Sequence, residues 1–261
     1  MTTPVSIGGT LWQPASGCGD RCRDGGAGRR GAAGVVVRVG ALAAVLLGGL
    51  LLVMLSSAAL RTLSRGILAV LGVRLVWRGP EPRPGSLLVA NHVSWLDVVA
   101  LTAIRPVRMV AKHDVRAWPG IGGTAVRAGT IFIDRTRPRA LPETVAEVAG
   151  ALRAGRSVVV FPEGTTYCGA ESGRFRSALF QAAIDAGAPV VPVSVGYDST
   201  EAAFVGEDTL GGSIVRIART RGLTVTLAAA PALRPDPGAD RRELARAAQA
   251  SLAGRGYRLA A

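Results

Sequence analysis

The run Ser86-Leu87-Leu88-Val89-Ala90-Asn91-His92-Val93-Ser94-Trp95-Leu96-Asp97 decides the fold of this 261-residue chain. It opens with a short apolar segment, which is typical of a strand buried on both faces of a sheet. Similar apolar runs recur downstream with helical patterns between them. Strands that alternate with helices predict an α/β fold with a mostly parallel central sheet flanked by helices. We expect strands over 86–90, 107–111, 130–133, 157–161 and 190–195, and helices over 140–154 and 175–186.

The last third of the chain has less regular hydrophobic patterns than the segments before it. Residues 213–218 and 223–228 alternate between apolar and polar side chains, which favours two edge strands. Residues 240–252 indicate a basic amphipathic helix that ends the chain. Gly187 follows the helical pattern over 175–186 and is a plausible helix stop.

Composition points to a membrane surface. Hydrophobic residues make up 49% of the chain, and the formal net charge is +13. Lys112 is the one lysine, so nearly all of the positive charge is carried by arginine, which pairs bidentately with phosphate. Anionic lipid and nucleic acid are both candidate partners. Aromatic residues make up 5%, too few for base-stacking platforms, so we expect membrane lipids and no nucleic acid.

The chain divides into four predicted parts. Residues 1–34 are rich in Gly and Arg and are expected to be disordered; residues 35–72 form a membrane-anchoring helical segment. A globular domain follows over 73–232, and 233–261 add the basic C-terminal helix. The three cysteines, Cys18, Cys22 and Cys168, form no disulfide framework. Because Cys18 and Cys22 lack companions at zinc spacing, we expect free thiols in a reducing compartment and no metal site.

The anchoring segment contains a long uncharged stretch. Residues 39–60 carry no charge and would reach ~33 Å as a helix, enough to cross the hydrocarbon core. Gly48-Gly49 could kink the stretch, so a re-entrant hairpin is an alternative to a crossing, as is a buried core helix. Five arginines flank it on each side, so the charges predict no orientation. Residues 61–72 could form a second helix in the headgroup plane.

His92 and Asp97 are the leading candidates for chemistry. His92 follows the carboxyl end of a predicted strand, where open α/β sheets bind ligands. Asp97 can hold one imidazole nitrogen and leave the other as a base. Since residues five apart on a regular helix diverge, the pairing needs a turn at His92 with Asp97 on the incoming helix. An N-capping role for one of them is the plain alternative. Ser94 has no Gly-x-Ser-x-Gly setting and is interpreted as a local hydrogen-bonding residue.

Two further segments suggest a phosphate site. The strand over 130–133 leads to Asp134 and Arg135, and a guanidinium there can grip phosphate; a surface ion pair between these two residues is the alternative. Phe161-Pro162-Glu163-Gly164-Thr165 forms a turn in which Gly164 permits close backbone approach. Glu163 could bind a hydroxyl or orient Arg135, and the cations of 173–176 precede a helix.

Taken together, four blocks resemble the membrane acyltransferase family typified by lysophosphatidic acid acyltransferase. They are residues 91–97, 129–135, 161–165 and 190–195, in this order, and the resemblance spans about 74–230. The resemblance implies His92 and Asp97 as catalytic residues. It also implies substrate-binding residues, namely Asn91, Lys112, Arg135, Glu163, Gly164, Thr165, Arg176 and Pro192. The segment after Gly173 departs from the usual family pattern, which leaves the acceptor headgroup open.

The resemblance further implies direct acyl transfer from acyl-coenzyme A or acyl carrier protein to a lysophospholipid hydroxyl. The preferred acceptor is 1-acylglycerol-3-phosphate, which gives phosphatidic acid; a lyso-ornithine lipid or glycerol 3-phosphate is the alternative. Neither a metal nor another cofactor is expected. Because the donors are cytosolic, we expect a cell inner or plasma membrane location with the catalytic domain facing the cytoplasm. A non-catalytic protein that binds anionic lipid is the rival class, and an oriented base counts against it.

Overall fold

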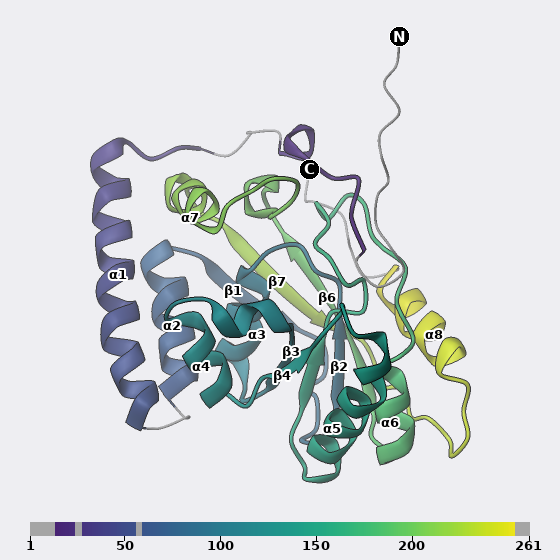
Figure 1. Ribbon diagram of the computed structural model, residues 1–261. Helices are drawn as coiled ribbons and strands as arrows, with labels where there is room; N and C mark the ends of the chain where they lie inside the picture. Colours follow the sequence, from purple (N-terminus) through teal and green to yellow (C-terminus); the bar gives the residue numbers. More distant parts are fainter. Residues whose placement is uncertain (1–13, 24–27, 56–58, 254–261) are drawn as a thin grey trace.

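The computed structural model describes residues 14–23, 28–55 and 59–253 (Figure 1). Its seven strands are β1 (Arg74–Arg78), β2 (Leu87–Ala90), β3 (Arg108–Lys112), β4 (Ile131–Ile133), β5 (Val158–Val160), β6 (Val190–Tyr197) and β7 (Thr224–Ala229). The α-helices are α1 (Ala32–Leu55), α2 (Ala59–Leu71), α3 (Leu96–Ile104), α4 (Ile121–Arg127), α5 (Leu141–Arg153), α6 (Phe180–Ala186), α7 (Leu210–Arg219) and α8 (Arg241–Ala253). Short 3-10 turns lie at Asp20–Cys22, His113–Ala117, Pro138–Ala140 and Thr200–Ala202.

All seven strands form one sheet in the order β1-β7-β6-β2-β5-β3-β4. Every neighbouring pair is parallel except β6 and β7, which are antiparallel. The predicted α/β fold with a mostly parallel sheet is therefore confirmed. β2 is the middle strand of the order, so the residues that follow it leave the sheet at its centre. Polar residues at this point are flanked by the ends of β5 and β6, which is where open α/β sheets bind ligands.

Helices cover both faces of the sheet and give three layers (Figure 1). One apolar cluster joins α1, α2, α3 and α7 to side chains such as Leu88 and Val193. The other joins α5, α6 and α8 to Leu87 and Val190. Leu87 and Leu88 are adjacent yet belong to opposite clusters, because successive strand residues point to opposite faces. Burial on both faces explains why β2 has no polar position along its length.

Helices α1 and α2 lie side by side at one edge of the molecule (Figure 1). The window Ala32–Gly49 of α1 is long and apolar enough to cross a membrane, and only 17% of it is buried. The helix runs through Gly48-Gly49 without a break, and a Cβ at Gly49 would lie 2.3 Å from Leu63 Cδ1. Gly49 therefore permits close packing of the two helices. The predicted span over 39–60 starts too late by several residues, and 56–58 lie outside the described residues.

The predicted strands over 86–90, 107–111, 130–133, 157–161 and 190–195 are all present, within one or two residues at their ends. The strand expected over 213–218 is wrong, because this segment belongs to helix α7. Thr209 caps that helix by accepting a hydrogen bond from Gly212 N at 3.1 Å, and Ser213 and Ile217 are buried one turn apart. The segment at 223–228 is a strand but not an edge strand, since β7 lies between β1 and β6.

The described part of the tail is ordered against the domain. Arg30 N donates to Arg219 O at 2.8 Å, and Arg29 forms an isolated β-bridge with Thr220, the residue that follows α7. Arg23 pairs with Asp208 at 3.0 Å. The expectation of disorder over 1–34 is therefore wrong for residues 14–23 and 28–34, because these segments find polar partners on α7 and the loop before it. Residues 1–13 and 24–27 of that tail, and 254–261 at the other end, lie outside the described residues.

Candidate active site

His92 and Asp97 meet at the carboxyl end of β2. His92 Nδ1 lies 2.8 Å from Asp97 Oδ2; the imidazole is 21% exposed and the carboxylate is fully buried. Asp97 lies in the first turn of α3, so the chain turns between the two residues as the pairing required. The N-cap of α3 is Trp95, with no side-chain cap hydrogen bond, so the N-capping alternative does not hold for this helix.

Asp97 is held by several donors besides the imidazole. Its Oδ2 atom also accepts hydrogen bonds from Val93 N at 2.7 Å and Ser94 N at 2.9 Å. Its Oδ1 atom accepts one from the Tyr197 hydroxyl at 2.5 Å. Burial, followed by the nearby Asp97 charge, raises the pKa of Tyr197 well above its usual value, so this phenol remains a donor at working pH. These donors fix the orientation of the Asp97 carboxylate toward His92.

The rest of the His92 environment comes from the turn after β5. The imidazole stacks on the Phe161 ring, with ring centroids 4.0 Å apart and an interplanar angle of 16°. The buried Glu163 accepts hydrogen bonds from His92 N at 2.7 Å and Gly173 N at 2.9 Å. Burial raises the pKa of Glu163 to about 7, although these two hydrogen bonds oppose the shift. Glu163 therefore contacts protein backbone, and no contact with Arg135 is among its described hydrogen bonds.

Two arginines converge on Gly164. Arg135, which follows β4, donates a hydrogen bond from Nη1 to Gly164 O. A Cβ at Gly164 would lie 3.5 Å from Arg176 Nε, and the φ of +78° at this residue favours glycine. Burial and then the Arg176 charge lower the pKa of Arg135. Two cations this close favour an anion between them. The alternative ion pair between Asp134 and Arg135 is wrong, because Asp134 pairs with Arg137 at 2.7 Å.

Asn91 and Ser94 have local structural contacts. Asn91 is 1% exposed; its Nδ2 donates to Val195 O at 2.9 Å, and its Oδ1 accepts from Val195 N at 2.7 Å. The structure therefore uses both polar atoms of Asn91 to extend the contact between β2 and β6, in place of the expected substrate contact. Ser94 Oγ accepts from Leu96 N at 3.4 Å, which agrees with its interpretation as a local hydrogen-bonding residue.

The remaining predicted site residues, Thr165, Lys112 and Pro192, belong to three different parts of the fold. Thr165 is half-buried in the same turn as Gly164. Lys112 ends β3, is exposed and forms an ion pair with Asp114. Pro192 is buried inside β6, in register with Val89 of the central strand. Lys112 is therefore an exposed residue at the carboxyl end of β3. Pro192 lies within the sheet, beside Val89, and so precedes the carboxyl end of β2 where His92 lies.

Gln249 of α8 also supports the site, although the sequence patterns did not single it out. Its Oε1 atom accepts from Phe175 N at 2.9 Å, and its Nε2 atom donates to Gly173 O at 2.9 Å. Gly173 N in turn donates to Glu163, so α8 fixes the loop that carries Arg176. No spacing pattern could reveal this, since Gln249 lies more than seventy positions after the loop.

All three cysteines lie together, which corrects the expectation that Cys18 and Cys22 lack a companion. The sulfur atoms of Cys18, Cys22 and Cys168 lie within 4.8 Å of one another, and all three thiols are free. The sequence spacing could not show this because Cys168 belongs to the loop after β5, far along the chain.

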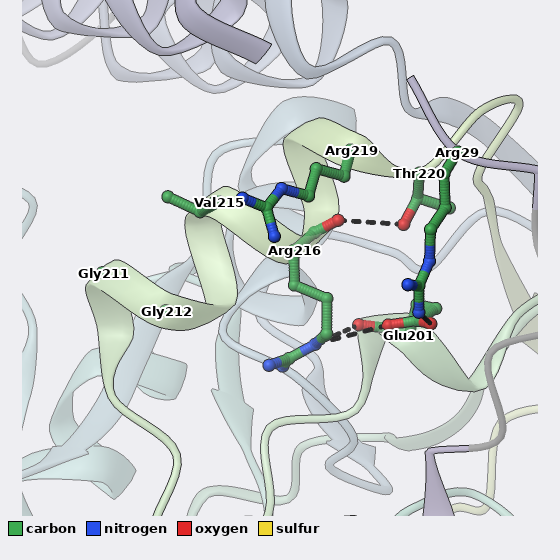
Figure 2. Close-up of a pocket in the computed structure, with 8 residues that line it drawn as sticks. All are labelled: Arg29, Glu201, Gly211, Gly212, Val215, Arg216, Arg219 and Thr220. Atoms are coloured by element: carbon green, nitrogen blue, oxygen red, sulfur yellow. Dashed lines mark hydrogen bonds and ion pairs between the residues drawn. The ribbon is translucent and has the colours of Figure 1, made fainter. Parts of the chain in front are cut away.

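A separate cavity of about 460 Å³ lies beside α7 (Figure 2). Glu201 lies between Arg29 and Arg216 in it, with N to O distances of 3.4 and 3.8 Å. None of the predicted site residues lines this cavity, so it is distinct from the His92 site. Its lining residues are Arg29, Glu201, Gly211, Gly212, Val215, Arg216, Arg219 and Thr220.

Comparison with known proteins bears on this site. The model of the Acyltransferase family matches residues 74–196, a range that includes His92, Asp97, Arg135 and Glu163. A solved structure, the 1-acyl-sn-glycerophosphate (LPA) acyltransferase PlsC from Thermotoga maritima, superimposes with a TM-score of 0.55. The match covers 75% of this chain and 76% of that one at 22% sequence identity, so it supports the fold.

Curated relatives are more similar in sequence. The 1-acyl-sn-glycerol-3-phosphate acyltransferase of Neisseria meningitidis is 42% identical over 52% of this chain, and the chain spans about half of that relative's length, 54%. The lyso-ornithine lipid O-acyltransferase of Pseudomonas aeruginosa is 38% identical over 67% of this chain and 69% of its own length. With the family model matched across the site and a relative covered over two thirds of its length, the chain belongs to the acyltransferase family that includes these lysolipid acyltransferases.

Proposed function

We propose that this protein transfers a fatty acyl group from acyl-coenzyme A or acyl carrier protein to the free hydroxyl of a lysophospholipid, with 1-acylglycerol-3-phosphate as the acceptor and phosphatidic acid as the product. The single observation that carries the proposal is the 2.8 Å contact between His92 Nδ1 and Asp97 Oδ2 at the carboxyl end of the central strand. With Nδ1 engaged, Nε2 is the nitrogen left to accept a proton.

In the proposed reaction His92 Nε2 removes the proton of the acceptor hydroxyl as its oxygen attacks the thioester carbonyl. The new carbon–oxygen bond forms, the carbon–sulfur bond breaks, and the proton held by His92 passes to the departing thiolate. Asp97 stabilises the transient imidazolium, and the Tyr197 hydroxyl and two backbone N–H groups keep the Asp97 side chain aligned with His92. The acyl group passes directly, without a covalent enzyme intermediate. Ser94 fits this scheme, because its buried hydroxyl is occupied by Leu96 N.

The acceptor phosphate would lie against Arg135 and Arg176 at the Gly164 turn. These cations are close enough for Arg176 to lower the pKa of Arg135, and a phosphate dianion would relieve that repulsion. This feature favours a phosphate headgroup over the zwitterionic headgroup of a lyso-ornithine lipid. The second acceptor stays a candidate because the Pseudomonas relative, which is named for it, is matched over 69% of its length.

The lipid substrates call for a site at a bilayer surface, and α1 supplies an apolar helix long enough to anchor it. We infer an inner or plasma membrane location with the catalytic domain facing the cytoplasm, because both candidate donors are cytosolic. Arginines near the membrane would add about 1 kcal/mol each through anionic headgroups.

Purified protein in detergent tests the proposal with labelled acyl-coenzyme A, acyl carrier protein and a panel of lysolipid acceptors. We expect labelled phosphatidic acid from 1-acylglycerol-3-phosphate, and a loss of turnover of about 10²- to 10⁴-fold in His92→Ala. His113→Ala is the matched control, because His113 is the other histidine and is exposed. Full turnover in His92→Ala would refute the base, and acylation of only lyso-ornithine lipid would refute the acceptor.

A further inference from the structure

The convergence of all three cysteines is not used by the proposed acyl transfer. Cys18 lies two residues before the 3-10 turn Asp20–Cys22, Cys22 is the last residue of that turn, and Cys168 lies in the loop that follows β5. Their three sulfur atoms lie within 4.8 Å of one another, and Cys18 and Cys168 are 5% and 4% exposed. Two segments far apart in the sequence therefore bring the three thiols of the chain together, two of them buried and one half-buried.

The arrangement suits a tetrahedral metal ion. Zinc–thiolate bonds of ~2.3 Å place the sulfur atoms of a tetrahedral site roughly 3.8 Å apart, so the observed cluster needs only a small contraction around an ion. Cys18 and Cys22 are separated by three residues, within the spacing that zinc ligand pairs use. A fourth donor is at hand, because Glu171 Oε2 lies 3.6 Å from Cys18 Sγ. Soft thiolates select zinc over hard cations such as Mg²⁺.

We propose that Cys18, Cys22, Cys168 and Glu171 bind one Zn²⁺ ion that fastens the N-terminal segment to the active-site loop. Four protein ligands would close the coordination sphere, which is typical of a structural zinc and leaves no position for substrate. A disulfide would join only two of the three cysteines and would leave the third thiol without a covalent partner, whereas a zinc ion can bind all three thiolates. The zinc site goes beyond the acyltransferase proposal and does not depend on it.

The position of the cluster indicates what the ion would hold. Tyr167, next to Cys168, donates from its backbone N to His92 O at 2.8 Å. Before Cys18, the segment passes over the proposed phosphate turn, since a Cβ at Gly164 would lie 2.7 Å from Pro14 Cγ. Zinc would therefore fix residues 14–22 across the loop that borders His92 and Gly164. Loss of the ion would loosen this cover, whereas the His92–Asp97 pair belongs to other elements and would persist.

Metal analysis of the full-length protein, purified with reductant and without chelator, tests the site in the absence of any lipid substrate. We expect about one zinc ion per chain. After removal of zinc, Co²⁺ should give the visible bands of a tetrahedral site and a thiolate-to-metal charge-transfer band. Cys22→Ser is the mildest ligand variant because Cys22 is only half-buried, and it should weaken metal binding more than about tenfold. Glu171→Gln should weaken binding without removing the thiolate band.

Glu207→Gln is the matched control, because Glu207 is an exposed carboxylate outside the cluster, and it should bind zinc like the wild type. Thermal unfolding of each variant separates a loss of ligand from a loss of fold. Two results would overturn the proposal: wild-type protein that binds neither zinc nor cobalt, or an intact mass under non-reducing conditions that reveals a disulfide in the freshly purified chain. Neither result bears on acyl transfer, which the His92→Ala assay tests by itself.

Discussion

Tyr197 and Asp97 form a 2.5 Å hydrogen bond across a hundred positions of sequence, from the end of β6 to the first turn of α3. The phenol takes the carboxylate oxygen that His92 does not use. Because Asp97 is fully buried, a donor lost from it cannot be replaced by bulk water. Tyr197 therefore acts as a positioning residue for the candidate base, through the carboxylate that orients it.

We expect Tyr197→Phe to lower kcat by roughly 10- to 100-fold, in line with about 1.5–3 kcal/mol for a hydrogen bond to a charged group. The KM values for donor and acceptor should change little, since the phenol contacts Asp97 and not a substrate. Steady-state kinetics with each substrate varied in turn measures this split. Tyr167→Phe is the control, because the Tyr167 backbone, and not its hydroxyl, contacts His92. Raised KM values with an unchanged kcat would contradict the positioning role.

Arg135→Ala tests the proposed phosphate contact. We expect the KM for 1-acylglycerol-3-phosphate to rise by about 10- to 100-fold, because a charge-assisted hydrogen bond to phosphate is lost. The KM for the acyl donor should stay near the wild-type value. Arg137→Ala is the matched control, since Arg137 is 71% exposed and pairs with Asp134. If only the KM for the acyl donor rose, Arg135 would contact the thioester substrate and not the acceptor phosphate.

Glu163 makes stability depend on pH. Its folded-state pKa of about 7 lies above the ordinary value of 4.5, so the folded protein binds this proton more tightly than the unfolded chain. The contribution of protonated Glu163 is complete below about 4.5 and is lost as the pH rises to 7 and beyond. We expect the apparent Tm of the wild type, relative to Glu163→Gln, to fall between pH 5 and pH 8.

Differential scanning fluorimetry at a series of pH values measures this, because the chain has four tryptophans. Glu147→Gln, at an exposed position of α5, is the control and should follow the wild-type curve. A wild-type advantage that grows with pH would show that the hydrogen bonds from His92 N and Gly173 N outweigh burial, and would reverse the assigned sign.

The sequence predicted correctly those strands whose hydrophobic residues form a continuous local run. Leu87–Ala90 and Val158–Val160 are continuous apolar runs between turns, and such runs are reliable signs of strands buried on both faces. β1 was missed because Arg74 and Arg78 occupy its two ends and resemble the basic flank of a membrane segment. Residues 213–218 of α7 were predicted as a strand because their apolar and polar side chains alternate. Thr209, a typical N-cap residue, was the sequence signal for a helix at this point.

The site shows the same division. The five-residue spacing of His92 and Asp97 could be interpreted from sequence, since a single turn brings them together. Tyr197 could not be assigned, because its hydrogen bond depends on β6 lying next to β2 in the sheet. The same holds for Cys168, which meets Cys18 and Cys22 only after the tail has folded over the domain. Long-range partners follow from topology, which no local pattern contains.

Gln249 provides the last test, because it joins α8 to the loop that carries Arg176. Gln249→Ala leaves Phe175 N and Gly173 O without their side-chain partner, at a cost of about 1–3 kcal/mol. We expect the apparent Tm to fall by roughly 2–10 °C. The KM for a phosphate-bearing acceptor should also rise, because the loop positions Arg176 at the Gly164 turn.

Gln181→Ala is the matched control for this prediction. The Gln181 side chain pairs with Asp185 one turn along α6, an exposed contact that contributes about 0.2–0.5 kcal/mol. A Tm equal to that of Gln181→Ala would mean that the Gln249 hydrogen bonds contribute no more than a surface pair. A lower Tm with an unchanged acceptor KM would restrict Gln249 to holding α8 on the domain. A change in both quantities would link the C-terminal helix to acceptor binding through the two hydrogen bonds that Gln249 makes with residues 173–175.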